Sequence, residues 1–133
     1  MEQTFAIIKP HAVKAKLSGK IIEMIENSGF EIVEMKKITM NQAQAQALYA
    51  EHKERPFYSG LVSIMTASPL IVLKLQKNGA VAQWRDLMGA TNPANAAQGT
   101  IRALFGNSLD ENAVHGSDST TSAARELAIF FGN

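Results

Sequence analysis

Two short apolar runs constrain the fold of this chain more than any other feature. Residues 5–8 read Phe-Ala-Ile-Ile and are ended by Lys9-Pro10, and residues 70–75 read Leu-Ile-Val-Leu-Lys-Leu. Each run is too short for a typical helix and rich in strand-forming residues, so both predict mostly buried strands. A third strand is predicted over residues 30–38. Its alternation slips between Ile32 and Val33, which indicates a bulge or a two-sided strand.

Helical spacing of apolar residues fills most of the sequence between these strands. Gly29 is placed to end the first helix and Asn41 to cap the second. The predicted helices cover residues 17–28, 41–51, a short stretch around 61–65, 81–88, a single turn at 101–105, and 124–131. Ala113, Val114 and His115 predict a short last strand. Strand-helix-strand units at each end of the chain favour a sheet with helices packed on it.

Length and charge exclude several classes of protein. A chain of 133 residues is long enough for one domain with a core, so we expect a single domain over residues 1–133. The net charge of +1 provides no overall field for nucleic acid or for a membrane surface. There is no cysteine, which fits a reducing compartment, and no leader-like or membrane-spanning segment is recognisable. We therefore expect a cytoplasmic protein with no membrane and no specific nucleic-acid partner.

Common phosphate and hydrolase motifs are missing. The pair Gly19-Lys20 lacks the earlier glycine and the following Ser or Thr of a phosphate-binding loop. The serines near His115 do not form a Gly-x-Ser-x-Gly elbow. The three histidines are scattered without the spacing of metal ligands, so no protein-built metal site is expected.

The stretch 112–119, Asn-Ala-Val-His-Gly-Ser-Asp-Ser, is the strongest candidate for chemistry. It places His115 beside small residues and hydroxyls, just before the predicted last helix. Imidazole is the side chain best suited to act as a nucleophile or proton carrier near neutral pH. A phosphate brought there would be favoured by the helix N-terminus. Taken alone, the stretch favours the structural alternative, a hydrogen-bonded histidine in a turn before a helix cap.

Potential anion-binding residues are dispersed along the chain: Lys9, Arg85, Thr91, Asn92, Arg102 and Asn112. Each has a structural alternative, since Lys9 could be solvated, the two arginines could form surface ion pairs, and Thr91 could cap a turn. Their spacing along the chain does not show whether these residues lie close together in the fold.

Four segments, in order, resemble the nucleoside diphosphate kinase family. They are residues 4–10 (Thr-Phe-Ala-Ile-Ile-Lys-Pro), 55–58 (Arg-Pro-Phe-Tyr), 89–93 with 99–102 (Gly-Ala-Thr-Asn-Pro and Gly-Thr-Ile-Arg), and 112–119. The resemblance covers almost the whole chain. It implies an α+β fold, a ferredoxin-like sandwich whose four-stranded antiparallel sheet is covered by helices. It also implies transfer of a γ-phosphoryl group from a nucleoside triphosphate such as ATP to a nucleoside diphosphate.

The resemblance assigns roles by position. His115 would be the nucleophile of a ping-pong reaction and form a pros-phosphohistidine, with Glu126 as the nearby carboxylate and Lys9 as a further catalytic group. The implied nucleotide-binding residues are Lys9, Tyr49, Phe57, Arg85, Thr91, Arg102, Leu109 and Asn112. Phe57 would stack on the base. Stacking recognises the flat π face that all bases share, so broad base specificity would follow. Mg²⁺ would arrive held mainly by the nucleotide phosphates.

Some positions depart from the family pattern. His11 stands where many members have aspartate, and Glu111 where some have arginine. The chain ends at Asn133, before the tail that many relatives carry. We expect a homo-oligomer, a tetramer or hexamer, with a dimer also possible. Two other functions stay open, a nucleotide-binding module without turnover and an oligomeric partner of nucleic acid or protein. A salt-sensitive DNA-binding assay would identify a nucleic-acid partner.

Overall fold

The computed structural model describes residues 1–132. Its strands and helices alternate along the chain as the apolar runs predict. In order they are β1 (Glu2–Ile8), α1 (Pro10–Lys14), α2 (Ser18–Asn27), β2 (Glu31–Ile38), α3 (Gln42–Leu48), η1 (Ala50–His52), α4 (Tyr58–Thr66), β3 (Leu70–Lys77), α5 (Ala80–Met88), η2 (Pro93–Asn95), α6 (Ile101–Phe105), β4 (Val114–Gly116) and α7 (Thr120–Phe131).

The strands form one antiparallel sheet in the order β2-β3-β1-β4. The two runs that predicted buried strands therefore lie side by side at its centre, with Phe5 opposite Lys74. The short strand β4 forms one edge and pairs Ile7 with His115. The register of β2 shifts between Ile32 and Glu34, which confirms the predicted bulge. The expected four-stranded antiparallel sheet is confirmed.

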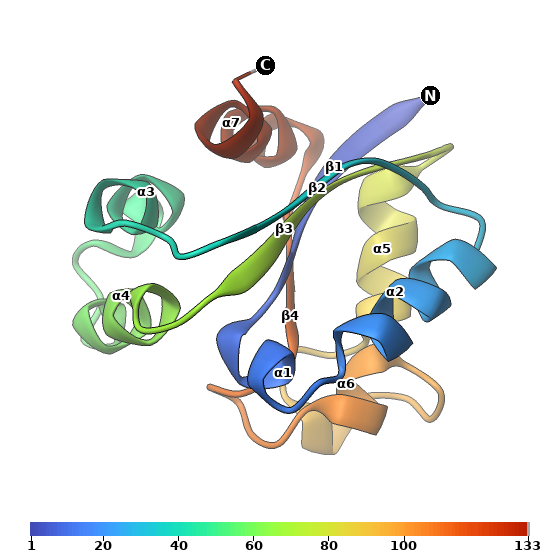
Figure 1. The fold of residues 1–133 in the computed structure, drawn as a ribbon, viewed down its shortest axis with the longest axis horizontal. Helices are drawn as coiled ribbons and strands as arrows, with labels where there is room; N and C mark the ends of the chain where they lie inside the picture. The colour runs from blue at the N-terminus through green and yellow to red at the C-terminus, as the bar shows by residue number, and fades with distance from the viewer. Residues whose placement is uncertain (133) are drawn as a thin grey trace.

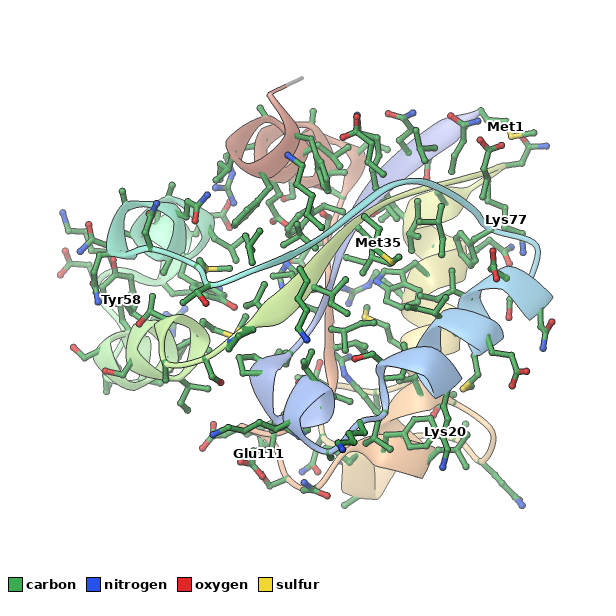
Figure 2. All side chains as sticks on the ribbon, in the orientation of Figure 1. Met1, Lys20, Met35, Tyr58, Lys77 and Glu111 are labelled. Atoms are coloured by element: carbon green, nitrogen blue, oxygen red, sulfur yellow. The ribbon has the colours of Figure 1, made fainter. Side chains whose placement is uncertain are left out.

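Helices cover both faces of this sheet (Figure 1). Because side chains alternate along a strand, Phe5 and Ile7 point into one cluster with residues of α3, α4 and α7. Ala6 and Ile8 point into a second cluster, which contains residues of α2 and α5. Side chains fill both layers, and the labelled Met35 of the edge strand β2 is about half exposed (Figure 2). The sheet thus holds β4 between two packed layers.

Some predicted details are wrong. The sequence reading missed α1, which begins at Pro10 immediately after β1; proline is tolerated in the first turn of a helix because its missing N–H would have no partner there. Of the apolar residues that predicted the last helix, Leu127 and Phe130 are buried, but Ala124 is exposed and its neighbour Ala123 is buried instead. Ile64, one of the apolar residues whose spacing predicted the short helix around 61–65, is 41% exposed, whereas Met65 is buried.

The predicted second helix is also too long. It ends at Leu48, and a separate 3₁₀ turn follows Tyr49. Asn41 does cap it, through a reciprocal pair of hydrogen bonds with Gln44. Among residues 1–132, no helix is long and apolar enough to cross a membrane.

Candidate active site

Strand β4 holds His115 at one edge of the sheet. The indole Nε1 of Trp84, on α5, donates to the His115 carbonyl at 3.2 Å. The next residue, Gly116, lies so close to α5 that a Cβ there would be 2.5 Å from Trp84 and 2.6 Å from Met88. Only glycine allows this approach, which explains the small residue after the histidine.

The ring of His115 is oriented by a buried carboxylate. Its Nε2 lies 3.0 Å from Oε1 of Glu126, on α7, and the Ser117 hydroxyl donates to the same oxygen at 2.9 Å. Glu126 is 5% exposed. An ionised carboxylate only accepts hydrogen bonds, so Nε2 carries the proton and Nδ1 keeps its lone pair. Among the hydrogen bonds of the described residues, none involves Nδ1.

Arg125 connects this carboxylate to the segment that runs from the end of α3 into η1. Its guanidinium lies 3.6 Å from Oε2 of Glu126 and 3.7 Å from Glu51. It also donates to the Ala47 carbonyl at 2.8 Å, near the C-terminus of α3. Arg125 was not among the site residues predicted from the sequence. A basic residue beside a predicted catalytic glutamate was the only available signal.

Lys9 and Asn112 form a buried polar pair opposite the histidine. The Lys9 ammonium donates to Oδ1 of Asn112 at 2.7 Å, and the Asn112 amide donates to the Thr91 carbonyl at 3.0 Å. Burial lowers the pKa of Lys9 to about 8, with the positive charge of Arg102 adding to the effect and Asp110 opposing it. Lys9 is therefore not the solvated lysine that its sequence also allowed.

The two arginines differ in their surroundings. Arg102 is buried and donates to the carbonyls of Asn112, Gly89 and Val114. Burial lowers its pKa to about 10, with the positive charge of Arg85 adding to the effect. Arg85 is exposed and pairs with Asp118 at 3.0 Å, the surface ion pair that its sequence allowed. Arg102 thus binds three backbone carbonyls in the interior, whereas Arg85 lies at the exposed edge of the site.

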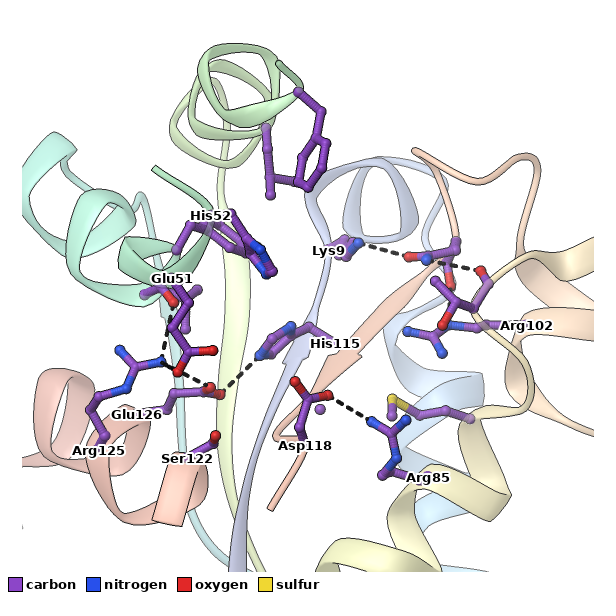
Figure 3. A pocket seen from close by; sticks show the side chains of 18 residues that line it. Lys9, Glu51, His52, Arg85, Arg102, His115, Asp118, Ser122, Arg125 and Glu126 are labelled. Carbon is purple, nitrogen blue, oxygen red and sulfur yellow. Dashed lines mark hydrogen bonds and ion pairs between the residues drawn. The ribbon is translucent and has the colours of Figure 1, made fainter. Parts of the chain in front are cut away.

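A cavity of about 240 Å³ brings these groups together (Figure 3). All the predicted site residues except Leu109 line it. Leu109 is 56% exposed and lies outside the lining. The lining residues that the sequence reading did not assign are Leu48, Glu51, His52, Leu61, Met88, Gly116, Asp118, Ser122 and Arg125. No cluster of three metal-ligating side chains occurs within residues 1–132.

Two aromatic residues complete the cavity. The Tyr49 hydroxyl is buried without a hydrogen-bond partner among the described residues, and burial raises its pKa, with the charge of Glu126 adding to the rise. A buried hydroxyl of this kind is costly unless a ligand satisfies it. Phe57 is 52% exposed, and its ring centroid lies 5.5 Å from that of His52. The cavity therefore combines an exposed aromatic ring with several cationic side chains, which suits a phosphorylated ligand with a flat group.

Comparison with known proteins gives the family. The family model for nucleoside diphosphate kinase matches residues 2–133. The chain belongs to the nucleoside diphosphate kinase family. A member from Trichlorobacter lovleyi is 58% identical over 133 residues, which are 100% of this chain and 96% of the relative. A member from Geotalea daltonii is 56% identical over 133 residues, which are 100% of this chain and 97% of the relative.

Solved structures of nucleoside diphosphate kinases share the fold. The apo enzyme from Encephalitozoon cuniculi has a TM-score of 0.97 at 33% identity, over 100% of this chain and 90% of that one. The enzyme from Halobacterium salinarum, in complex with CDP, has a TM-score of 0.96 at 40% identity, over 99% and 88% of the two chains. The ferredoxin-like α+β fold is confirmed. As a nucleoside diphosphate kinase, this chain transfers the γ-phosphoryl group of a nucleoside triphosphate to a nucleoside diphosphate by the family's ping-pong route.

Proposed function

We propose that His115 is the nucleophile of this kinase and that Nδ1 is its reacting atom. The observation that carries the proposal is the contact of Nε2 with Glu126 at 3.0 Å, which leaves the second ring nitrogen for the substrate. His115 also lines the cavity that contains Lys9, Arg85 and Arg102. A nucleophile fixed in one tautomer and surrounded by cations suits attack on a phosphate.

The reaction proceeds as two half-reactions. Nδ1 of His115 forms a bond to the γ-phosphorus, the bond from that phosphorus to the β,γ-bridging oxygen breaks, and the nucleoside diphosphate leaves with the electron pair. A terminal phosphate oxygen of a second nucleoside diphosphate then attacks the phosphohistidine, and the P–N bond breaks. One pocket serves donor and acceptor in turn, because the two nucleotides differ only in the phosphoryl group.

The cavity residues compensate the charge that phosphoryl transfer places on the phosphate oxygens. Arg85 and Arg102 offer planar donor groups to these oxygens. Tyr49 and Thr91 supply hydroxyls, and the buried Tyr49 hydroxyl has no other partner among residues 1–132. Lys9 and Asn112 would bind the sugar hydroxyls and the phosphate end.

Phe57 would stack on the nucleotide base at the exposed rim of the cavity. Its half-exposed ring offers a flat face without hydrogen-bonding groups, so bases of different kinds would bind. Leu109 would reach the base from outside the described lining. The relative from Halobacterium salinarum was solved with CDP, a nucleotide of the kind proposed here.

Mg²⁺ would enter with the nucleotide. The lining carries Glu51 and Asp118 besides Glu126, too few carboxylates for a cage but able to hold waters of an ion bound to phosphates. The bound ion would neutralise part of the phosphate charge during transfer.

The kinase would act as a homo-oligomer in a reducing compartment such as the cytoplasm. Strand β2 lies at an edge of the sheet, where Val33 and Met35 are 38% and 48% exposed. A second copy would cover these apolar side chains. The expected assembly is a tetramer or hexamer, with a dimer possible, and light scattering after size exclusion measures it. A single monomeric species at micromolar concentration would contradict the proposal.

The absence of cysteine supports a reducing compartment for this protein.

The phosphoryl-transfer proposal is tested by labelling. Incubation with γ-labelled ATP and Mg²⁺ should leave an acid-labile, base-stable label on the protein, and added GDP should remove it as labelled GTP. Nucleotide binding without a transferable label would replace the kinase mechanism by a binding module.

Nucleotide affinity should fall as the pH rises through about 8, because Lys9 loses its proton there and with it its attraction for phosphates. Calorimetric titration of ADP between about pH 7 and pH 9 measures the change. The Lys9→Met variant, which has no charge to lose, should bind more weakly and without this part of the pH dependence. The same slope in both proteins would remove Lys9 as its source.

A further inference from the structure

The backbone just before His115 adopts a strained turn. Ala113 has a φ of +74°, although it carries a Cβ and is fully buried. The Val114 N–H donates to the Asn112 carbonyl at 2.9 Å across it. A bond of this span around a residue with positive φ is the rare form of γ-turn, which is unfavourable for any residue except glycine. Such a turn persists only where its surroundings hold it.

His11 supplies one of the groups that hold this turn. Its Nε2 accepts the hydrogen bond of the Ala113 N–H at 2.9 Å, from 102 positions away in the sequence. The Lys9 N–H donates to the Ala113 carbonyl at 2.9 Å, and Arg102 holds the Asn112 carbonyl. Lys9, between β1 and α1, and His11, in the first turn of α1, thus bind both polar groups of the Ala113 backbone.

The turn lies between two groups of the proposed site. Asn112, on one side, binds Lys9 and the Thr91 carbonyl, and His115 lies two residues beyond Ala113 on the other side. We propose that neutral His11 is a positioning residue for phosphoryl transfer, because its Nε2 holds the Ala113 turn and thereby places Asn112 and His115. This inference rests on the proposed role of His115. His11 itself does not line the cavity and would not touch the nucleotide.

The protonation state of His11 follows from the same contact. A nitrogen that accepts a hydrogen bond carries no proton, so a neutral His11 carries its proton on Nδ1. Protonation of Nε2 would place two N–H groups against each other. The charged groups acting on the ring are Glu111, whose segment passes α1 in Figure 2, and Lys9 at the end of β1. Burial is the largest influence and lowers the pKa of His11, with Lys9 adding to this and Glu111 opposing it.

A pair of variants at position 11 tests the role. His11→Leu keeps a side chain of similar size without an acceptor, whereas His11→Gln places a carbonyl oxygen the same number of bonds from Cβ as Nε2. We expect kcat of the Leu variant to fall by about tenfold at pH 8 with KM changed less, and the Gln variant to stay within about twofold of the wild type. Equal activity of all three proteins, or equal losses in both variants, would overturn the inference.

The strain itself provides a second test. Ala113→Gly removes the Cβ that makes the positive φ unfavourable. If His11 acts by holding this turn, its replacement by leucine should cost clearly less in the Ala113→Gly background than in the wild type. Equal costs in the two backgrounds would contradict a role through the turn.

Two readouts remain if the leucine variant fails to fold. The activity ratio of His11→Gln to wild type should rise as the pH falls below the ordinary histidine pKa of about 6.5, because only the wild type loses its acceptor on protonation. Long-range ¹H–¹⁵N NMR at neutral pH should show His11 protonated on Nδ1 alone. A ratio independent of pH, or a proton on Nε2, would refute the proposal. An inactive wild type would instead reject the proposed phosphohistidine mechanism at His115.

Discussion

Replacing His115 by glutamine is expected to reduce phosphoryl transfer by at least about 10⁴-fold, the order of magnitude that loss of an enzyme's nucleophile costs. Glutamine can still face Glu126, but it has no ring nitrogen that can form a phosphoramidate. Transfer from ATP to GDP measures the loss, and the label from γ-labelled ATP should be absent.

Nucleotide binding should survive this change, because the cationic side chains of the cavity come from other segments. The Kd for ADP should stay within about fivefold of the wild-type value, and the far-UV circular dichroism should not change. His52→Gln, which removes another imidazole of the same lining, is the matched control and should still take the label. A labelled His115→Gln protein would exclude His115 as the nucleophile.

The central strands were predictable because burial alone determines which residues they contain. Residues 5–8 and 70–75 are buried on both faces of the sheet, and such strands are continuous apolar runs. The slip in alternation at Ile32 predicted a bulge or a two-sided strand, and the register shift in β2 decides for the bulge. The short α1 was not predictable in this way. A helix of five residues has no periodicity to read, and its first residue, Pro10, reads equally as the end of a strand.

The candidate site could be predicted only in part. His115 has a local signal, a polar residue among small ones before a helix. Arg102 has none, because its burial depends on the carbonyls of Asn112, Gly89 and Val114, which the chain brings together only on folding. Arg125 was missed because its contacts with Ala47 and Glu51 join segments that are far apart in sequence. Family resemblance supplied the remaining positions, and the structure places all of them in the cavity lining except Leu109.

The dependence on folding also explains how the site is built. Lys9 directly follows β1, whose residues 4–8 are buried, and its backbone N–H holds the turn at Ala113 while its side chain holds Asn112. The buried sheet and the cavity residue Asn112 are therefore held together through Lys9. Changes at this junction should affect stability and transfer together, whereas changes at the rim should affect binding alone.

Arg102 provides the sharpest test of that distinction. Arg102→Ala should lower the free energy of unfolding by about 3 kcal/mol, because it leaves three carbonyls without their charged donor. For a domain of this size the midpoint of thermal unfolding should fall by about 10 °C. Transfer, measured at a temperature where the variant is folded, should fall by about 10²- to 10³-fold because a cation beside the phosphates is lost.

Two matched variants separate the structural and the phosphate-binding parts of this effect. Arg85→Ala removes a guanidinium that is paired only with the exposed Asp118, so the free energy of unfolding should change by less than about 0.5 kcal/mol while nucleotide binding weakens. Arg102→Lys keeps the charge but lacks the planar group of donors that reaches three carbonyls, so it should recover part of the transfer and little of the stability. If Arg102→Ala and Arg85→Ala were equally stable, the three backbone contacts of Arg102 would not hold the site together. If Arg102→Ala were destabilised but transferred phosphate at the wild-type rate, Arg102 would be a structural residue alone.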